Sequence, residues 1–376
     1  PEDIHQAEKK TELQKRDIVL SKTAYPAASL VTFERCNTSQ DTIATTLSTY
    51  GRSMYFPEAI VVYLNSSFGE RLLWRQFQGN VQLHLSLDDG RKVPVPRMGK
   101  ALQEKLTQLF EKANATRQRA IVDADRSEQT LLRALGLENW QPPEPLTYTR
   151  SSRDAFAAGR LDAEHFKPKY TNLEAHIRAT GRCVSLGTLL IINERGTQPE
   201  YGETGLPVVN SKHVANGEVR LNDDNRLALA NSKALKIKKS DVLINGTGVG
   251  TIGRTAPYLH DQEAIPDNHV TILRPRKGSI DPVYLSVFLN SLAGQYQVNK
   301  WLRGSSGQIE LYPNDIAQFL VWIAPDEIQQ SIKTAIDSAF VKKRNAIALL
   351  DAAKRAVEIA IESDEATALE FLKSLA

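Results

Sequence analysis

The chain has 376 residues, 41% hydrophobic and 24% charged, which suits two or three domains of a soluble globular protein. Its net charge of +3 permits nucleic-acid binding through a local basic patch but does not require it. Two cysteines exclude a disulfide framework or a zinc cluster, no apolar run reaches the roughly 18 residues of a membrane span, and residues 1–15 are too polar for a signal peptide, so we expect a cytoplasmic protein.

Residues 17 to 97 contain short apolar and β-branched runs separated by turns, which predicts a β-rich region. The expected strands are Ile18–Leu20, Ser29–Phe33, Ile43–Leu47, Val81–Leu87 and Val93–Val95. A short helix is expected at Ala59–Asn65, because Pro57 and Glu58 suit a first helical turn.

From Lys100 to Leu135 the hydrophobic period changes to that of a long helix. Apolar residues spaced alternately by four and three form a coiled-coil seam, which includes Leu102, Leu106, Leu109, Ala113, Thr116 and Ala120. Gly136 suits the helix C-cap, and the proline-rich segment 141–145 is expected to be a stiff linker.

The rest of the chain follows the same plan at greater length. The expected elements are a helix at Tyr170–Ala179, strands at Thr188–Asn193, Pro207–Asn210, Asp241–Ile244, Val270–Leu273 and Phe319–Ile323, and a short helix at Asp281–Leu292. A second long helix is predicted from Asp326 to Ser363, with a seam that includes Ile328, Ile332, Lys342, Leu349 and Ala356.

The two β-rich regions repeat the same features in the same order, at an offset of 224 to 226 residues. The matched pairs are Asp17–Leu20 with Asp241–Ile244, Asp41–Thr45 with Asp267–Thr271, Tyr63–Ser66 with Phe288–Ser291, Gly69 with Gly294, Gly79 with Gly304, and Gln82 with Gln308. Solenoid repeats are only about 20 to 50 residues long. The offset therefore predicts two copies of one domain-plus-helix module.

The two helical seams align at the same offset, and each has a polar residue at the same level, Thr116 and Lys342. Polar residues within a seam fix register and orientation at some cost in stability. We expect the helices to pack antiparallel on each other, through Leu102, Leu106, Leu109, Ile328, Ile332 and Leu349. The alternative is two unrelated amphipathic helices, each covering its own domain.

The modules differ at their front ends, because the second has about eighty residues before Asp241 and the first has sixteen before Asp17. The first module thus lacks a counterpart of residues 160–239 and is expected to expose a sheet edge. The expected boundaries are 1–98 for a partial first domain, 99–137 for a helix, 138–158 for a linker, 159–325 for the second domain, 326–365 for a helix and 366–376 for a tail.

Several motifs partly match catalytic or cofactor-binding patterns. Gly248–Gly253 fits the G-x-G-x-x-G pattern, but the sequence that follows is a poor helix start, so a glycine-rich hairpin turn is the better interpretation. Pro266-Asp267 lacks the following acid-x-Lys of a metal nuclease, and the Pro142-Pro143 pair lacks the aromatic residue of an amino-methyltransferase motif. The seven histidines show no metal-ligand spacing. The sequence shows no catalytic constellation.

Polar and basic residues gather in the loops of both regions. Arg, Lys, Asn, Gln, Ser and Thr side chains contact base edges and phosphates in protein–DNA complexes, although solvated turns are polar too. The candidate DNA-binding residues are Lys22, Thr23, Arg75, Gln78, Asn80 and Gln82 in the first region and Asn210, Lys212, His213, Asn245, Thr247, Arg254, His269, Arg303, Ser305, Ser306 and Gln308 in the second. Two such surfaces suit a repeating polymer such as DNA.

With these residues in view, the chain resembles the specificity (S) subunit of type I restriction–modification systems. From about 159 to 362 the resemblance is carried by Arg160–Pro168, Ser240–Ile244 with the glycine-rich turn to Gly253, Leu289–Ser291 and Gly304–Gln308. It continues over 16–135 with the front missing, where Ala24–Pro26 replaces the glycine-rich turn and Gly79–Gln82 replaces Gly304–Gln308.

This resemblance implies an α+β fold with two β-rich target-recognition domains joined by two long antiparallel coiled-coil helices in a pseudo-twofold repeat. It implies that each complete domain reads half of a bipartite double-stranded DNA site, and that the helices set the gap. The subunit is not an enzyme and holds no cofactor. It directs methyltransferase subunits, which use S-adenosylmethionine to methylate adenine at N6, and a restriction/translocase subunit can join them.

Two other interpretations remain open from the sequence. The chain could be the C-terminal specificity region of a single-chain methyltransferase–specificity fusion. It could also be a scaffold of a different class, in which paired helices join two β-domains that bind proteins.

Overall fold

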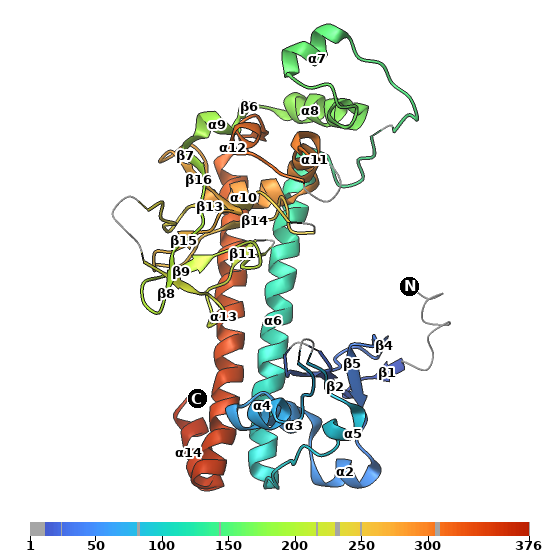
Figure 1. Ribbon diagram of the computed structural model, residues 1–376, viewed down its shortest axis with the longest axis vertical. Coiled ribbons are helices and arrows are strands. Elements are labelled where there is room, and N and C mark those ends of the chain that lie inside the picture. Colours follow the sequence, from blue (N-terminus) through green and yellow to red (C-terminus); the bar gives the residue numbers. More distant parts are fainter. Residues whose placement is uncertain are drawn as a thin grey trace. The chain divides into compact units, whose positions relative to one another are not determined.

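The computed structural model describes residues 12–375, except 24, 81–82, 143, 216, 230–233, 249 and 305–308. The chain divides into two compact units (Figure 1). Unit 1 comprises residues 1–120 and 341–376, and unit 2 comprises residues 121–340. No helix in the described parts of the chain is both long and apolar enough to cross a membrane.

Unit 1 contains a small antiparallel sheet in the order β3–β2–β5 and a separate antiparallel pair, β1 with β4. These strands are β1 (Glu12–Gln14), β2 (Ile18–Ser21), β3 (Ala28–Leu30), β4 (Arg35–Asn37) and β5 (Thr42–Thr45). Ile18 and Leu20 of β2 are buried whereas Val19 between them is half-buried, as the alternation of a half-buried strand requires.

The short helices of unit 1 are α2 (Thr49–Met54), α3 (Pro57–Leu64), α4 (Ser67–Trp74) and α5 (Leu87–Gly90). Every residue of α3 is buried, so this helix forms the centre of the unit 1 core. The strands expected at Val81–Leu87 and Val93–Val95 are wrong in the described residues. The Ser86 hydroxyl accepts a hydrogen bond from the Asp89 amide (3.0 Å) and starts α5 instead, and residues 93–95 have no strand partner.

Unit 2 has two four-stranded sheets, in the orders β14–β13–β16–β7 and β15–β9–β12–β8, and two strand pairs, β17–β6 and β10–β11. The strands are β6 (Cys183–Ser185), β7 (Leu190–Arg195), β8 (Tyr201–Gly202), β9 (Leu206–Val209), β10 (Val214–Ala215), β11 (Glu218–Val219), β12 (Leu227–Ala228), β13 (Val242–Asn245), β14 (Thr255–Pro257), β15 (Ile265–Pro266), β16 (Val270–Pro275) and β17 (Leu320–Trp322). Only β15 and β9 pair in parallel among the described ladders.

The central strand β13 is buried on both faces, which explains its run of four apolar or neutral residues. Val242 and Ile244 enter the core shared with the helices, and Leu243 enters a second core with Val209 and Tyr258 on the opposite face. The helices of unit 2 are α7 (Ser152–Ala158), the 3-10 turn η2 (Glu164–Phe166), α8 (Pro168–Thr180), α9 (Leu186–Leu189), α10 (Pro282–Asn290), α11 (Leu292–Trp301) and α12 (Pro313–Ile316).

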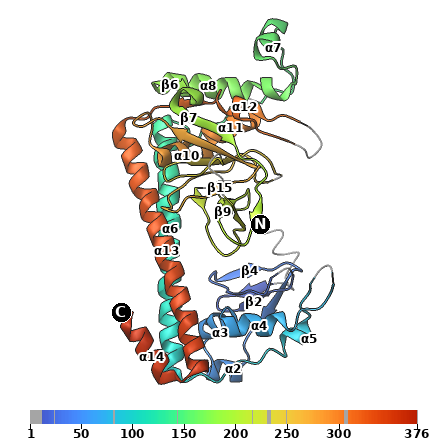
Figure 2. The same cartoon turned by 60° about the vertical axis from the view of Figure 1, so that its left-hand side comes forward.

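The two long helices are α6 (Lys100–Leu135) and α13 (Asp326–Glu362), and a short helix, α14 (Glu365–Ser374), follows α13. In unit 1, Leu102 and Leu106 share a core with Ala356 of the late part of α13. In unit 2, Leu131 of the late part of α6 shares a core with Ile332 of the early part of α13. The helices are therefore antiparallel, and both views show them side by side within each unit (Figures 1 and 2).

The α+β fold class expected from the sequence is confirmed, with helices and small sheets in both units and two long antiparallel helices. Among the expected pairing residues, Leu102, Leu106 and Ile332 are fully buried. Leu109 and Ile328 pack at the edges of the two cores, and Leu349 is half-buried.

The internal repeat extends to individual hydrogen bonds. Asn65 follows α3, and its side chain bonds both the amide and the carbonyl of Ala28 (3.1 and 2.8 Å). Asn290 at the end of α10 makes the same pair of bonds to Thr255 (2.9 and 2.6 Å). A side chain that satisfies both backbone groups of one strand residue fixes the helix end against the sheet, and both units use it.

The long helices carry a second shared bridge. Gln103 of α6 accepts a hydrogen bond from the Phe56 amide (2.8 Å) and donates to the Met98 carbonyl (2.8 Å). Gln329 of α13 accepts from the Asp281 amide (3.1 Å) and donates to the Ala324 carbonyl (2.8 Å). In each unit a long helix is thereby fixed to the start of the buried short helix.

The repeat differs from the expected alignment at β5 and β16. Ile18 pairs with Thr45, and its equivalent Val242 pairs with Leu273, so Thr45 corresponds to Leu273 at an offset of 228. The expected match of Asp41–Thr45 with Asp267–Thr271 is therefore wrong by two residues. A two-residue slip leaves every side chain on the same face of the sheet, so the alternation in the sequence cannot detect it.

Candidate nucleic-acid interface

One edge of unit 2 brings together loops that follow β13 and precede β16. The Gly246 amide donates to the His269 carbonyl (2.8 Å), and the Thr247 hydroxyl lies 2.6 Å from Nδ1 of His269. His269 is exposed and Thr247 is half-buried. Two residues expected from the sequence to contact DNA, 22 positions apart, therefore form one polar group at the surface.

A backbone bridge between Arg303 and Glu310 lies beside this group. Arg303 and Glu310 exchange two backbone hydrogen bonds of 2.8 Å, and the Leu311 amide donates to the Gly246 carbonyl (2.8 Å). Thr247 also forms a bridge with Glu310. The structure thus gathers Thr247, His269 and Arg303 from three separate loops. The expected residues Ser305, Ser306 and Gln308 lie outside the described residues.

The charges at this edge are nearly balanced. Arg303 forms a two-pronged ion pair with the buried Asp315 (2.7 Å for both bonds), and this contact raises the pKa of Arg303 above its usual range. Arg195 pairs with Glu310 (3.3 Å), and its guanidinium lies 5.2 Å from the centre of the Tyr312 ring. A hydrogen bond from Tyr312 lowers the pKa of Glu310. Such a surface suits polar contacts with bases more than strong binding to many phosphates.

Asn245 and His213, both expected to contact DNA, are buried instead. The Asn245 side-chain amide donates to the carbonyls of Ser211 (3.0 Å) and Thr251 (3.2 Å) and so ties two loops to the end of β13. Nδ1 of His213 accepts from the Asn210 amide (3.2 Å), and burial lowers the pKa of His213. The expectation of a DNA contact is corrected for both residues, because both side chains are buried. Their hydrogen bonds position the loops instead.

The other expected residues of unit 2 lie in the same loops. Asn210 is half-buried, Lys212 is exposed near Asp224 (3.9 Å), and Arg254 is half-buried directly before β14.

Unit 1 has the same arrangement at equivalent positions. Gln78 and His84 exchange two backbone hydrogen bonds (2.9 and 2.8 Å), and the Leu85 amide donates to the Lys22 carbonyl (2.8 Å). Thr23 forms a bridge with His84, as Thr247 does with Glu310. The Gln78 side chain donates to Asp89 (3.0 Å), where Arg303 pairs with Asp315 in unit 2. Lys22, Thr23 and Gln78 therefore lie together in unit 1.

Two further residues expected to contact DNA in unit 1, Arg75 and Asn80, are exposed. The third, Gln82, lies outside the described residues.

Sequence reasoning missed four residues at these edges, His84 in unit 1 and Arg195, Glu310 and Tyr312 in unit 2. His84 and Glu310 are separated by the repeat offset, which could have identified them. Arg195 had no such signal, because unit 1 has no described counterpart of β7.

The glycine-rich segment that resembled a dinucleotide site is a turn between β13 and β14. Gly248 and Gly250 adopt left-handed backbone (φ 101° and 75°), and the segment leads into a strand and not a helix. The hairpin-turn interpretation is confirmed for the residues described there. In the part of the chain that the structure describes, no three His, Cys, Asp or Glu side chains are placed to hold a metal ion.

Comparison with known proteins finds similarity among solved structures. No protein-family model and no curated protein matches the chain. The type I restriction–modification S subunit from M. genitalium is 13% identical, with 96% of this chain and 83% of that chain covered and a TM-score of 0.41. The HsdS subunit from Thermoanaerobacter tengcongensis is 15% identical, with 94% and 82% covered and a TM-score of 0.32.

A third structure concerns complex assembly and conformational transition of the type I R-M system. It is 16% identical to this chain, with 91% and 82% covered and a TM-score of 0.31. The chain is thus similar to solved structures of type I specificity subunits.

Proposed function

We propose that the protein is a sequence-specific DNA-recognition subunit without catalytic activity of its own. It directs an adenine-N6 methyltransferase, and a restriction complex built on it, to a bipartite double-stranded DNA site. In this proposal residues 159–325 form the complete second reading domain, residues 1–98 form part of the first, and α6 and α13 set the spacing between half-sites. S-adenosylmethionine is bound by the methyltransferase partner.

One observation carries this proposal. Both units present the same surface edge, in which a loop threonine (Thr23 or Thr247) and a polar residue (Gln78 or Arg303) bridge to the same backbone position (His84 or Glu310). The polar residue differs between the units, with an amide side chain in unit 1 and a guanidinium in unit 2. Equivalent frames with different side chains are what two readers of different half-sites require.

The balanced charges predict how DNA binding depends on salt. In unit 2 the pairs Arg303–Asp315 and Arg195–Glu310 leave little net charge at the edge itself. We therefore expect few phosphate contacts, about three, and a loss of affinity of roughly 40-fold between about 50 and 200 mM salt.

Binding of the full chain to a randomised duplex library tests the proposal, with selection over several rounds and mobility shifts at rising salt. We expect a salt-sensitive complex and enrichment of defined base pairs. Complex formation that is insensitive to salt, or absent both with and without a methyltransferase subunit, would contradict the DNA function and favour a protein-binding scaffold.

Methylome sequencing of cells that express the complete system tests the bipartite adenine site directly. We expect N6-methyladenine within a motif of two specific parts separated by unspecified bases. A continuous motif would contradict the role proposed for the helices.

A further inference from the structure

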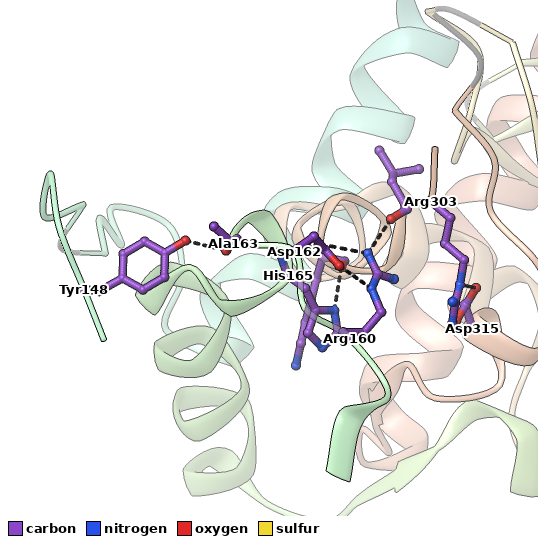
Figure 3. A network of polar contacts seen from close by, with 9 residues as sticks. Tyr148, Arg160, Asp162, Ala163, His165, Arg303 and Asp315 are labelled. Carbon is purple, nitrogen blue, oxygen red and sulfur yellow. Dashed lines mark hydrogen bonds and ion pairs between the residues drawn. The ribbon is translucent and has the colours of Figure 1, made fainter. Parts of the chain in front are cut away.

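The segment Arg160–Pro168, which carries part of the sequence resemblance, contacts the C-terminal end of α11 (Figure 3). In sequence the two are more than 130 residues apart. Arg303, which bridges to Glu310, comes directly after this end of α11. The contacts of Arg160–Pro168 therefore act on the backbone that leads into the candidate interface.

Arg160 is the centre of these contacts. Its side chain is only 7% exposed. Nε and Nη2 donate to the two carboxylate oxygens of Asp162 (2.6 and 3.0 Å), and Nη2 also donates to the Leu302 carbonyl (2.8 Å). A guanidinium that forms two hydrogen bonds with one carboxylate has little rotational freedom, so the direction of its hydrogen bond to the Leu302 carbonyl is fixed.

Asp162 has a second role in the same network. Its Oδ1 accepts from the His165 amide (3.1 Å), and Nδ1 of His165 lies 2.9 Å from the Lys300 carbonyl. Since a carbonyl oxygen only accepts, Nδ1 of His165 carries the proton in this contact. Burial lowers the pKa of His165, which favours the neutral ring. The His165 ring also packs edge-on against Trp301, at 4.8 Å between ring centres.

Two buried side chains therefore bind two carbonyls, Lys300 and Leu302, at the end of one helix. The last carbonyls of a helix have no partner within the helix, and a cation there is favourable because it opposes the helix dipole. An open pocket of about 620 Å³ lies beside Arg160, Tyr170 and Gly304. The backbone at 302–304 is thus little packed on that side, which makes its hydrogen bond to Arg160 more important.

We propose that Arg160, oriented by Asp162, is a positioning residue that fixes the bridge between Arg303 and Glu310 and so sets how selectively unit 2 reads DNA. The selectivity part rests on the proposed function, whereas the fixing of the Arg303–Glu310 bridge does not. Arg160 is buried, and its Nε and Nη2 both donate within the protein, so we assign it to holding the backbone. Its loss should change the discrimination between sequences more than the affinity for random DNA.

The first experiment measures amide hydrogen exchange in the free full-length chain. Arg160→Leu removes the donors, and Arg160→Lys retains one cation that can reach the Leu302 carbonyl. Arg153→Leu is the matched control, because Arg153 is exposed and belongs to α7 of the same unit, outside the Arg160–Pro168 segment. We expect the Arg303 and Glu310 amides to exchange about tenfold faster in Arg160→Leu. They should be partly restored in Arg160→Lys and unchanged in Arg153→Leu.

The second experiment repeats the selection from a randomised duplex library with the same variants. We expect Arg160→Leu to reduce the preference for the selected base pairs of one half-site by about tenfold, with little change in binding to unselected duplex. A double variant with Arg303→Ala should lose little more than Arg303→Ala alone, because Arg160 acts through Arg303.

The outcomes separate the two proposals. Unchanged exchange at Arg303 and Glu310 in a folded Arg160→Leu variant overturns the positioning role, whatever the DNA results are. Faster exchange with no sequence enrichment by the wild-type chain retains the positioning role and contradicts the proposed function. If Arg160→Leu does not fold, Asp162→Asn and Arg160→Lys give the same readouts, and a wild-type exchange pattern in both overturns the inference.

Discussion

Unit 1 and unit 2 share the same frame but complete their sheets differently. β2 and β13 each pair with two neighbours, and Asn65 and Asn290 each tie a helix end to a strand. In unit 2, β7 adds a fourth strand beside β16, whereas β5 is an edge strand among the described residues of unit 1. This shared frame does not depend on the fourth strand. The two asparagines bond β3 and β14, which lie on the side of the sheet that is present in both units.

A second strand is also present in only one unit. β6 pairs with β17 in unit 2, and the equivalent residues 94–96 of unit 1 form no strand. In unit 2 one continuous segment, residues 183–195, supplies both β6 and β7. The extra strand in the sheet and the β6–β17 pair therefore both come from this one segment of unit 2.

The largest expected effect is a loss of stability, and it tests whether the backbone is packed equally closely at Gly69 of unit 1 and Gly294 of unit 2. A methyl group on Gly69 would lie 2.1 Å from the Tyr63 carbonyl oxygen, and one on Gly294 would lie 2.2 Å from the Leu289 carbonyl oxygen. Because backbone atoms cannot move aside, Gly69→Ala and Gly294→Ala should each lower the free energy of unfolding by about 4 kcal/mol. Urea unfolding measures this loss.

Gly90→Ala serves as the control for these variants, because its methyl group would meet no atom closer than 3.8 Å. If either Gly69→Ala or Gly294→Ala lowered the free energy of unfolding by less than about 1 kcal/mol, the close backbone packing at this glycine would not be common to both units.

The next effect concerns the sheet edge. In unit 2 the Gly196 amide donates to the Val270 carbonyl and the Arg276 amide to the Leu189 carbonyl, so alternate residues of β16, including Ile272, face β7. Ala44 is the equivalent of Ile272, and it is exposed at the edge of β5. We expect the Ala44 amide to exchange about a hundredfold faster than that of Ile272, because edge amides lack a ladder partner.

Residue-resolved hydrogen exchange of the full chain checks this difference. The amide of Ile43, which faces β2, is the internal control and should be protected. Equal protection of Ala44 and Ile272 would mean that another segment pairs with β5 in solution.

The smallest effect is a difference in pH dependence. Burial lowers the pKa of His165 and of His213 in unit 2, whereas the described part of unit 1 has no buried histidine. A depressed pKa means that the unfolded state binds protons more readily, so this stability is present above about pH 6.5 and is lost as the pH falls. Unit 2 should therefore lose stability on mild acidification more than unit 1 does.

Urea unfolding at neutral and mildly acidic pH measures this loss, followed by the fluorescence of a variant that keeps only Trp74 of unit 1 and of a second variant that keeps only Trp301 of unit 2. His213→Gln should flatten the dependence of unit 2. An unchanged slope in that variant would assign the acid sensitivity to other groups.

Much of the fold could be predicted from local pattern. The expected limits of the first long helix coincide with α6, because a helix is specified by a period of 3.6 residues and by its own caps. The polar composition of the loops also indicated Thr23, Thr247, Gln78 and Arg303, which the structure brings into equivalent edges.

Only the tertiary structure decided which residues reach the surface and which strands find partners. Asn245 and His213 look like loop residues in the sequence, but neighbouring loops bury them and use their hydrogen bonds. Residues 94–96 and 320–322 occupy equivalent positions, yet only the second set is a strand, because a strand requires a neighbour from elsewhere in the chain. The limits of a helix are local properties, so the sequence alone determined them. Strand pairing and burial depend on residues that are far away in sequence, so only the tertiary structure decided them.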